Sequence, residues 1–358
     1  MAKIIYGIQS DGLGHYSRSK VVIDHLLAQG HQVKILTSER VYELMKDEYD
    51  VEKIARISFV YRSNRVNYTR TIYKNFVLFP SIIKDGLRKA SYVFKEFAPD
   101  LVITDFEYFS AKIASKRKVP ILCIDNIHSI SRTDAPKHVK RKYMMYEKEQ
   151  VSLVKILSPR SRSMKHYFIV SFFNPRPIRA KTTIIPPLIR EEIIDKKDEV
   201  EKDHIFVYQT SKTNKRLFPA LKEVNKEKFI IYGFDVEKKE ENLIFRKTRA
   251  GGQFLKDLST AKAVITNGGF SLMSEAVFLK KPILSNPVSG QFEQIMNATM
   301  LEREGYGAFS KRITPEAIKL FLRNLEKYRK NLAGFDHEDN SCALAEIDSK
   351  IEEILNSA

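Results

Sequence analysis

Short apolar runs alternate with stretches of helical periodicity along the whole chain, which is the pattern of alternating strands and helices. In the first half, strands are expected over Lys3–Ile8, Gln32–Thr37, Asp100–Thr104, Ile121–Asp125, Lys155–Leu157 and Thr183–Ile185. In the second half, they are expected over His204–Gln209, Lys228–Gly233, Leu243–Arg246, Ala263–Thr266 and Pro282–Ser285. This alternation predicts an α/β fold with parallel sheets that are covered on both faces.

The helical stretches carry apolar residues four positions apart and end at recognisable stop signals. A helix is expected roughly over Tyr16–Gln29, with Gly30 ending it. Two late helices, near Pro315–Lys330 and Cys342–Asn356, close the chain.

The chain of 358 residues suits two domains of ordinary size. Pro186-Pro187 and the charged stretch Arg190–Lys202 mark their junction. We therefore predict a first domain over residues 1–187, a linker over 188–203, a second domain over 204–340 and a terminal helix over 341–358.

Charge is distributed unevenly between the two halves. Residues 1–190 hold 34 Lys and Arg against 17 Asp and Glu, whereas the remaining residues hold 27 of each kind. The whole net charge of +17 therefore belongs to the first half. Halves that differ this much indicate two domains with different partners.

Composition excludes several classes of protein. Apolar residues make up 43% of the chain and charged residues 29%, which is typical of a globular protein and not of a disordered one. No apolar run approaches the roughly 18 residues of a membrane span. The first strand leads directly into a glycine loop, so no signal peptide is expected. Cys123 and Cys342 are isolated and lack metal-binding spacing, as expected for core thiols of a cytosolic protein.

The stretch from Ala263 to Gly307 carries the clearest chemistry. Its first strand runs into Asn267-Gly268-Gly269, and a helix that contains Glu275 starts near Ser271. Glycines between a strand and a helix let the backbone approach a diphosphate, and the free N–H groups of the helix hold its charge. The Glu275 carboxylate is placed to accept hydrogen bonds from ribose hydroxyls.

A second strand in this stretch leads to a Pro-Gly loop that ends in Gln291, Glu293 and Gln294. Glu293 and Gln294 can accept or donate hydrogen bonds to sugar hydroxyls. Together the two halves of the stretch predict a site for a nucleotide sugar.

The loop after the first strand reads Gly7-Ile-Gln-Ser-Asp-Gly-Leu-Gly-His-Tyr-Ser-Arg18. It lacks the Gly-x-Gly-x-x-Gly order, and no acidic residue ends the second strand, which argues against a dinucleotide-dependent dehydrogenase. His15 stands at a helix N-terminus, where the helix dipole disfavours its protonated form. A neutral imidazole is what a general base requires.

These motifs resemble those of GT-B glycosyltransferases, in particular the UDP-glycosyltransferases and the murein glycosyltransferase that makes lipid II. The shared donor-site pattern is present as Gly268-Gly269, Ser271, Glu275, Lys281-Pro282, Glu293-Gln294 and Asn297-Ala298. Lys280-Lys281 stands where the family prefers Gly before the Pro. The first loop resembles the family's "G-x-G-H-x-x-R" loop, which faces the cleft.

The resemblance implies two Rossmann-like domains that face a central cleft, with a C-terminal helix that crosses back to the first domain. It implies an acceptor loop that contains Asp11, Gly12, Gly14 and Arg18, in which the two glycines give room for an acceptor. His15 would be the catalytic base and Asp105 would orient it, although Asp105 also fits an ordinary carboxylate at a strand end. Asp11 is the alternative base.

The resemblance also assigns the donor contacts. Asn267, Gly268, Gly269, Ser271, Glu275, Glu293 and Gln294 would bind the donor, and Thr210 and Ser211 would contact its phosphates. Asp105-Phe-Glu107 could suggest a metal-binding Asp-x-Asp. It is rejected because this fold stabilises the leaving diphosphate with backbone dipoles and basic side chains. Neither a metal nor a cofactor is expected, and the UDP-sugar is a co-substrate.

Lys53–Lys95 holds ten Lys and Arg and one acidic residue, interleaved with Phe, Tyr and Ile. Such a stretch fits an anionic membrane surface or an anionic acceptor. It also fits a helical hairpin with a solvated basic face. No nucleic-acid motif accompanies it, so nucleic acid is not expected as a partner.

The sequence therefore predicts an inverting, metal-independent hexosyltransferase that moves a sugar from a UDP-sugar to a hydroxyl of a lipid-linked or cell-envelope acceptor. We expect it in the cytoplasm, with peripheral binding to the inner face of the plasma membrane. A UDP-sugar 2-epimerase of the same fold and a non-catalytic basic binding protein are the alternatives.

Overall fold

The structure is a computed structural model of the whole chain. It describes residues 1–357 except 11, 58–60, 63–64, 67–72, 74–79, 135, 159–160, 210–213 and 248–251. For residues 61, 62, 65, 66, 137, 138 and 140 it describes the backbone alone.

The chain divides into two compact units. The first unit comprises residues 1–60, 67–188 and 340–358, and the second comprises residues 61–66 and 189–339. The division falls after Leu188, one residue past Pro186-Pro187, and residues 189–203 of the stretch expected to be a linker belong to the second unit.

The first unit is built on a parallel sheet of seven described strands in the order β3-β2-β1-β6-β7-β8-β9. The strands are β1 (Lys3–Ile8), β2 (Gln32–Thr37), β3 (Val51–Lys53), β6 (Leu101–Asp105), β7 (Ile121–Asp125), β8 (Met164–Val170) and β9 (Thr182–Ile185). Its described helices are α1 (Leu13–Ala28), α2 (Glu39–Met45), α4 (Pro80–Phe97), α5 (Tyr108–Arg117), α6 (Ser129–Arg132), α7 (Lys137–Leu157) and α15 (Ser341–Asn356).

The second unit repeats this architecture with the order β12-β13-β11-β10-β14-β15-β16, in which β12 alone is antiparallel to its neighbour among the described strands. The strands are β10 (Ile205–Tyr208), β11 (Phe229–Tyr232), β12 (Lys238–Glu240), β13 (Leu243–Phe245), β14 (Ala263–Thr266), β15 (Ile283–Ser285) and β16 (Gly307–Phe309). The helices are α8 (Glu191–Ile194), α9 (Leu217–Lys222), α10 (Gly252–Ser259), α11 (Phe270–Phe278), α12 (Phe292–Glu304), α13 (Pro315–Arg323) and α14 (Leu325–Ala333). A short pair, β4 (Tyr61–Arg62) and β5 (Arg65–Val66), stands apart from both sheets.

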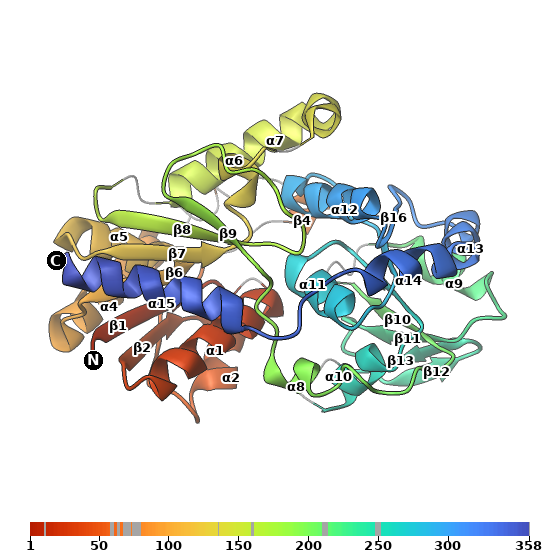
Figure 1. Cartoon of the computed structure of the whole chain (residues 1–358), viewed down its shortest axis with the longest axis horizontal. Helices are drawn as coiled ribbons and strands as arrows, with labels where there is room; N and C mark the ends of the chain where they lie inside the picture. The colour runs from red at the N-terminus through yellow and green to blue at the C-terminus, as the bar shows by residue number, and fades with distance from the viewer. Residues whose placement is uncertain are drawn as a thin grey trace. The chain divides into compact units, whose positions relative to one another are not determined.

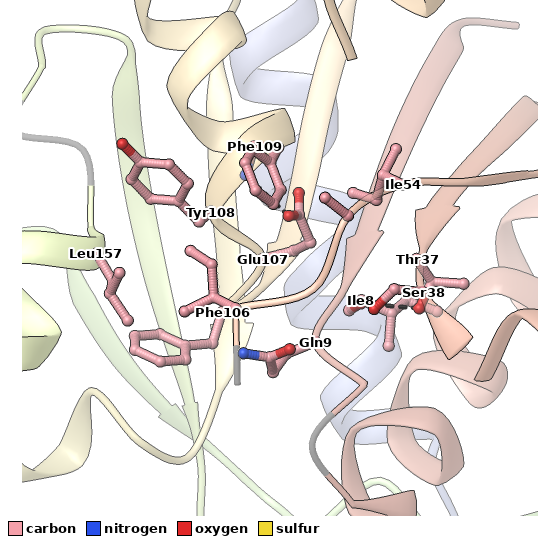
Figure 2. A pocket seen from close by; sticks show the side chains of 12 residues that line it. Ile8, Gln9, Thr37, Ser38, Ile54, Phe106, Glu107, Tyr108, Phe109 and Leu157 are labelled. Atoms are coloured by element: carbon pink, nitrogen blue, oxygen red, sulfur yellow. Dashed lines mark hydrogen bonds between the residues drawn. The ribbon is translucent and has the colours of Figure 1, made fainter. Parts of the chain in front are cut away.

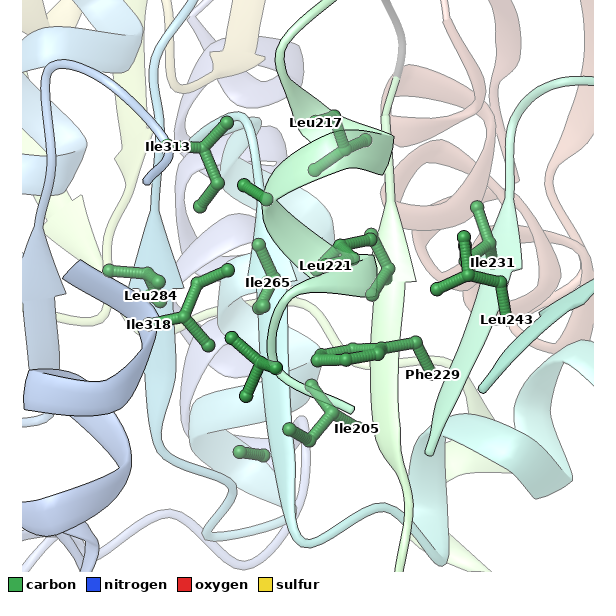
Figure 3. Close-up of a cluster of buried hydrophobic side chains, with 14 of the residues drawn as sticks. Ile205, Leu217, Leu221, Phe229, Ile231, Leu243, Ile265, Leu284, Ile313 and Ile318 are labelled. Carbon is green, nitrogen blue, oxygen red and sulfur yellow. The ribbon is translucent and has the colours of Figure 1, made fainter. Parts of the chain in front are cut away.

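Central strands such as β6, β7 and β14 are buried along their whole length, as expected where helices cover both faces of a sheet. In the second unit, Leu217 and Leu221 of α9 pack on Phe229 of β11 and Ile265 of β14, in one buried cluster (Figure 3). The sequence therefore predicts the α/β architecture with two parallel sheets correctly.

The terminal helix α15 packs against β8 and β9 and so belongs to the first unit (Figure 1). Ala343, Ile347, Ile351 and Ile354 are spaced by three or four positions and form its buried face. This spacing places the apolar residues on one face of the helix, which packs on the sheet.

One predicted strand is wrong. Lys155–Leu157 forms the last turn of α7, and the strand of this region is β8, further along the chain. A run of three residues is too short to distinguish a strand from a buried helical turn by its apolar character alone.

Candidate active site

In the first sheet, β1 has β2 on one side and β6 on the other, so the chain reverses its direction of winding beside β1. Ligands of open α/β sheets bind at such a switch point, outside the carboxyl ends of the strands. The loop after β1 leads to His15 in the first turn of α1, and Asp105 ends β6. Their side chains meet there, with His15 Nδ1 2.7 Å from Asp105 Oδ1.

The fully buried Asp105 carboxylate is also held by Arg18. Arg18 donates from Nε to Oδ2 at 2.7 Å and from Nη2 to Oδ1 at 2.6 Å, and Ser19 Oγ donates to Oδ2 at 3.2 Å. A buried carboxylate with this many donors is a fixed orienting group. Arg18, which the sequence assigns to the acceptor loop, thus forms a structural ion pair with Asp105.

Gly12 precedes α1 with φ +103°, a conformation that favours glycine, and a side chain there would meet no atom within 4 Å. Gly14 lies in the first turn of the helix. The loop is therefore open beside Gly12, as the predicted acceptor role requires. Asp11, the alternative base, lies outside the described residues.

A small pocket lies in the first unit near this edge. Figure 2 shows Leu157 on one side and Ile54 and Ser38 on the other, with Phe106 and Glu107 between them. None of the lining residues is basic. Phe106 carries a left-handed φ of 56°, which is strained for a bulky side chain.

A second histidine–carboxylate pair, which sequence analysis missed, follows the next strand. His128 Nδ1 lies 2.6 Å from Asp125 Oδ2, and its Nε2 lies 2.7 Å from Ser158 Oγ at the end of α7. Burial alone would raise the pKa of Asp125, but the charge and hydrogen bonds of His128 outweigh it and lower the pKa to about 2. The ionised Asp125 therefore holds Nδ1–H, and Nε2 shares a hydrogen bond with Ser158 Oγ.

The Cys123 thiol completes this cluster by donating to Asp125 Oδ2 at 3.1 Å. Cys123, Asp125 and His128 are the one set of described residues with metal-binding side chains close enough to share an ion. Burial, with Asp125 beside it, raises the pKa of the thiol well above its usual value. The three groups satisfy one another by hydrogen bonds, which fix the end of α7 to the sheet.

In the second sheet, the switch point lies beside β10, which has β11 on one side and β14 on the other. Gly268 and Gly269 follow β14 there. Gly268 has φ +102° and packs tightly on Gln294 and Ser285, whereas a side chain at Gly269 would meet no atom within 4 Å. Gly269 is the N-cap of α11, so the N-terminus of this helix lies beside the open space at Gly269.

Glu275 lies on α11 and is almost fully buried, at 4% exposure. Arg190 grips it with two parallel hydrogen bonds, from Nε to Oε1 at 2.8 Å and from Nη2 to Oε2 at 2.9 Å. Each carboxylate oxygen keeps one further lone pair, so Glu275 retains capacity for ribose hydroxyls. The sequence did not predict Arg190 as its partner.

The remaining predicted donor residues lie near the same edge. Asn267 is buried and donates to Gln209 Oε1 at 2.7 Å and to the Asn286 carbonyl at 3.2 Å, so it joins the ends of three strands. Gln294 Oε1 accepts from the Val288 N–H at 2.9 Å and holds the Pro-Gly loop. Ser271 and Glu293 are partly exposed in the first turns of α11 and α12.

Two predicted phosphate contacts, Thr210 and Ser211, lie outside the described residues. Among the described residues, no helix is both long and apolar enough to cross a membrane.

Comparison with known structures identifies the fold. The kitacinnamycin glycotransferase superposes with a TM-score of 0.67 at 14% identity and covers 98% of both chains. The glycosyltransferase SsfS6 of Streptomyces sp. SF2575, solved with thymidine diphosphate, gives a TM-score of 0.59 at 15% identity over the full length of both chains. These similarities show the GT-B glycosyltransferase fold.

Two curated relatives bear on the family. An uncharacterized glycosyltransferase of Methanosarcina acetivorans is 27% identical over 338 residues, which cover 89% of this chain and 88% of the relative. A Bacillus cereus UDP-N-acetylglucosamine–N-acetylmuramyl-(pentapeptide) pyrophosphoryl-undecaprenol N-acetylglucosamine transferase is 32% identical over 87 residues, which cover 22% of this chain and 25% of the relative. The sequence profile described as Glycosyl transferase family 1 matches residues 2–326. Because this match covers most of both units, the chain belongs to glycosyl transferase family 1.

Proposed function

We propose that this glycosyltransferase moves a sugar from a UDP-sugar to a hydroxyl of a lipid-linked or cell-envelope acceptor with inversion at the anomeric carbon. The observation that carries the proposal is the contact between His15 and the buried Asp105 at the switch point of the first sheet. Asp105 holds Nδ1–H and leaves the Nε2 lone pair of His15 as the base.

In the proposed reaction, His15 Nε2 takes the proton of the acceptor hydroxyl. The acceptor oxygen forms its bond to the anomeric carbon from the face opposite the nucleotide. The bond from this carbon to the diphosphate oxygen breaks, and UDP leaves with both electrons of that bond. One displacement inverts the configuration.

The second unit would bind UDP. The N-terminus of α11 and the open side of Gly269 favour a diphosphate, because a helix N-terminus carries a partial positive charge. Glu275 would accept the ribose hydroxyls, and Glu293 and Gln294 would contact the sugar. Neither a metal nor a cofactor takes part in the proposal, since backbone N–H groups and basic side chains take the charge of the leaving diphosphate.

Two relatives support the donor and acceptor classes. SsfS6 was solved with a nucleoside diphosphate, and the Bacillus cereus transferase is named for a UDP-sugar donor and an undecaprenol-linked acceptor. The excess of positive charge in the first half supports an anionic or lipid-linked acceptor at the inner face of the cytoplasmic membrane.

Incubation of the purified protein with a panel of UDP-, TDP- and GDP-sugars tests the proposal. We expect UDP-sugars to raise the melting temperature most. We also expect slow release of UDP as the sugar is transferred to water. Conversion of the sugar to its 2-epimer would replace the proposal with the epimerase alternative. If no nucleotide sugar changed the melting temperature, the alternative of a non-catalytic binding protein would be favoured.

A further inference from the structure

Helix α7 of the first unit carries an unusual surface. Met144, Met145 and Ile156 are 49%, 66% and 52% exposed. No other helix in the described part of the chain exposes three large apolar side chains. Exposed apolar side chains that cluster on one element indicate an interaction site.

The same face is basic. Arg141, Lys148 and Lys155 are exposed and pair with no carboxylate of a described residue. Met144, Met145, Lys148, Lys155 and Ile156 all follow the kink at Tyr143. At 3.6 residues per turn, these five residues occupy about a third of the helix circumference, and Arg141 lies just before the kink.

The opposite side of α7 is anchored. Leu153, Val154 and Leu157 are buried, and Ser158 at the helix end is hydrogen-bonded to His128. Figure 1 shows α7 as the yellow-green helix that extends beyond the strands of the first unit. Because the buried side of α7 packs on the first unit, its opposite side faces solvent.

We propose that this stripe, defined as Arg141, Met144, Met145, Lys148, Lys155 and Ile156, docks on an anionic lipid surface. Cations with long alkyl stems reach lipid headgroups, and methionines enter the boundary between headgroups and acyl chains. A soluble acidic partner would complement the cations but leaves the three exposed apolar side chains without a function.

The position of the stripe links the surface to the pocket. Leu157 lines the pocket at the end of the helix, and Met144 lies 13 residues earlier, about 20 Å along the axis. An acceptor held in the lipid surface would thus meet the pocket at the end of the docked helix. The inference rests on the proposed function only through this link to an acceptor. Binding to vesicles can be measured without an acceptor.

Cosedimentation of the full chain with phosphatidylcholine vesicles, with and without phosphatidylglycerol, tests the inference. We expect binding to the vesicles that contain phosphatidylglycerol and weak binding to the neutral ones. The variant with Arg141→Gln, Lys148→Gln and Lys155→Gln should bind about a hundredfold more weakly, since each cation near such a surface contributes roughly a factor of five.

A second variant, Met144→Ser with Met145→Ser, should still bind at low salt but should be released at a lower salt concentration than the wild type, because its apolar contribution is missing. The matched control carries Lys319→Gln, Leu320→Ser and Arg323→Gln on α13, where Leu320 is 59% exposed beside two exposed cations. It should bind like the wild type.

Unchanged circular dichroism and unchanged UDP affinity of the α7 variants would show that folding and the proposed donor site are intact. Vesicle binding that is insensitive to the α7 variants, or absent altogether, would overturn the inference. So would tight binding to heparin or RNA without vesicle binding, which would identify a soluble polyanion as the partner.

Discussion

The Nδ1 atom of His15 faces two partners that make opposite demands on it. It lies 2.7 Å from Asp105 Oδ1, which can only accept, and 2.7 Å from Arg18 Nη2, which can only donate. The ionised carboxylate is the stronger partner for a ring N–H, so Nδ1 carries the proton. Arg18 in turn neutralises Asp105, so this carboxylate chiefly orients the imidazole.

Replacement of His15 by Ala tests its role as the base. General-base catalysis contributes roughly 10²–10⁴ in rate, so transfer should fall by that factor while UDP affinity stays unchanged. His31, a histidine of the same unit that accepts from the Ala2 N–H, supplies the control variant His31→Ala. A loss of less than tenfold for His15→Ala would place the base elsewhere, and Asp11 would be tested next.

Glu275 requires a more careful substitution than the sequence suggests, because of its contact with Arg190. Glu275→Ala should weaken UDP binding by roughly tenfold to a hundredfold, as a charged hydrogen bond contributes about 1.5–3 kcal/mol. It should also lower the free energy of unfolding by about 3 kcal/mol, since it removes both hydrogen bonds that Glu275 accepts from the largely buried Arg190.

Calorimetry with UDP on Glu275→Ala and Arg190→Met separates the two effects. Arg190→Met should lose stability without losing the ribose contact. Equal UDP affinity of both variants and the wild type would show that Glu275 serves Arg190 alone.

The sequence predicts best those elements whose apolar pattern ends where residues that favour turns begin. β1, β2, β7 and β14 have the predicted bounds, and Ser or Asn directly follows the last three of these strands. α7 was missed because its first turns are strongly basic and its backbone is kinked at Tyr143, so its helical period is interrupted. Its last turn then reads as an isolated apolar run.

The docking of α15 on the sheet should depend on pH through His166 of β8. Burial lowers the pKa of His166 to about 4, and the charge of Lys350 on α15 adds to the effect; Glu353 opposes it, while Arg132 and Lys181 lower it further. The unfolded chain takes up the proton below about pH 6.5, whereas the folded chain does so only near pH 4. Stability should therefore decrease as pH falls from about 6.5 to 4.

Urea unfolding at pH 7 and pH 5 measures this dependence. His166→Gln keeps a polar partner for Thr183, whose Oγ1 lies 2.9 Å from His166 Nε2, and removes the titration. The variant should lose less stability between the two pH values than the wild type. An equal loss in both proteins would exclude His166 as a source of the dependence.

Over the whole molecule, the sequence indicates candidate site residues better than it indicates which side chains contact one another. His15, Asp105 and Gly268-Gly269 could be proposed from their resemblance to family motifs, and each lies at or just after a strand end. The pairs Arg190–Glu275 and His128–Ser158 could not, because they belong to no such motif and form through the packing of several elements. No periodicity or spacing in a single sequence encodes such a pair.

The concentration of charge in the first half is a property of the whole chain, and the structure describes only part of the segment that carries it. The end of the basic stretch Lys53–Lys95 forms most of α4, but much of the part before this helix, including Arg70 and Lys74, lies outside the described residues. Its membrane role therefore stays a prediction, and α7 supplies a surface on which the same partner can be tested.

The most direct test of the central claim, that the second unit binds a nucleoside diphosphate at the N-terminus of α11, is a calorimetric titration of UDP into the wild type and Gly269→Asp. Gly269 has φ −64° and ψ 128°, which any residue can adopt, and a side chain there enters empty space. Folding should thus be unaffected, with Gly269→Ala as the neutral control. The account predicts one UDP per chain for the wild type and an affinity at least about tenfold weaker for Gly269→Asp, because its carboxylate would face the diphosphate. Equal UDP affinity of both proteins, or no UDP binding by the wild type, would contradict it.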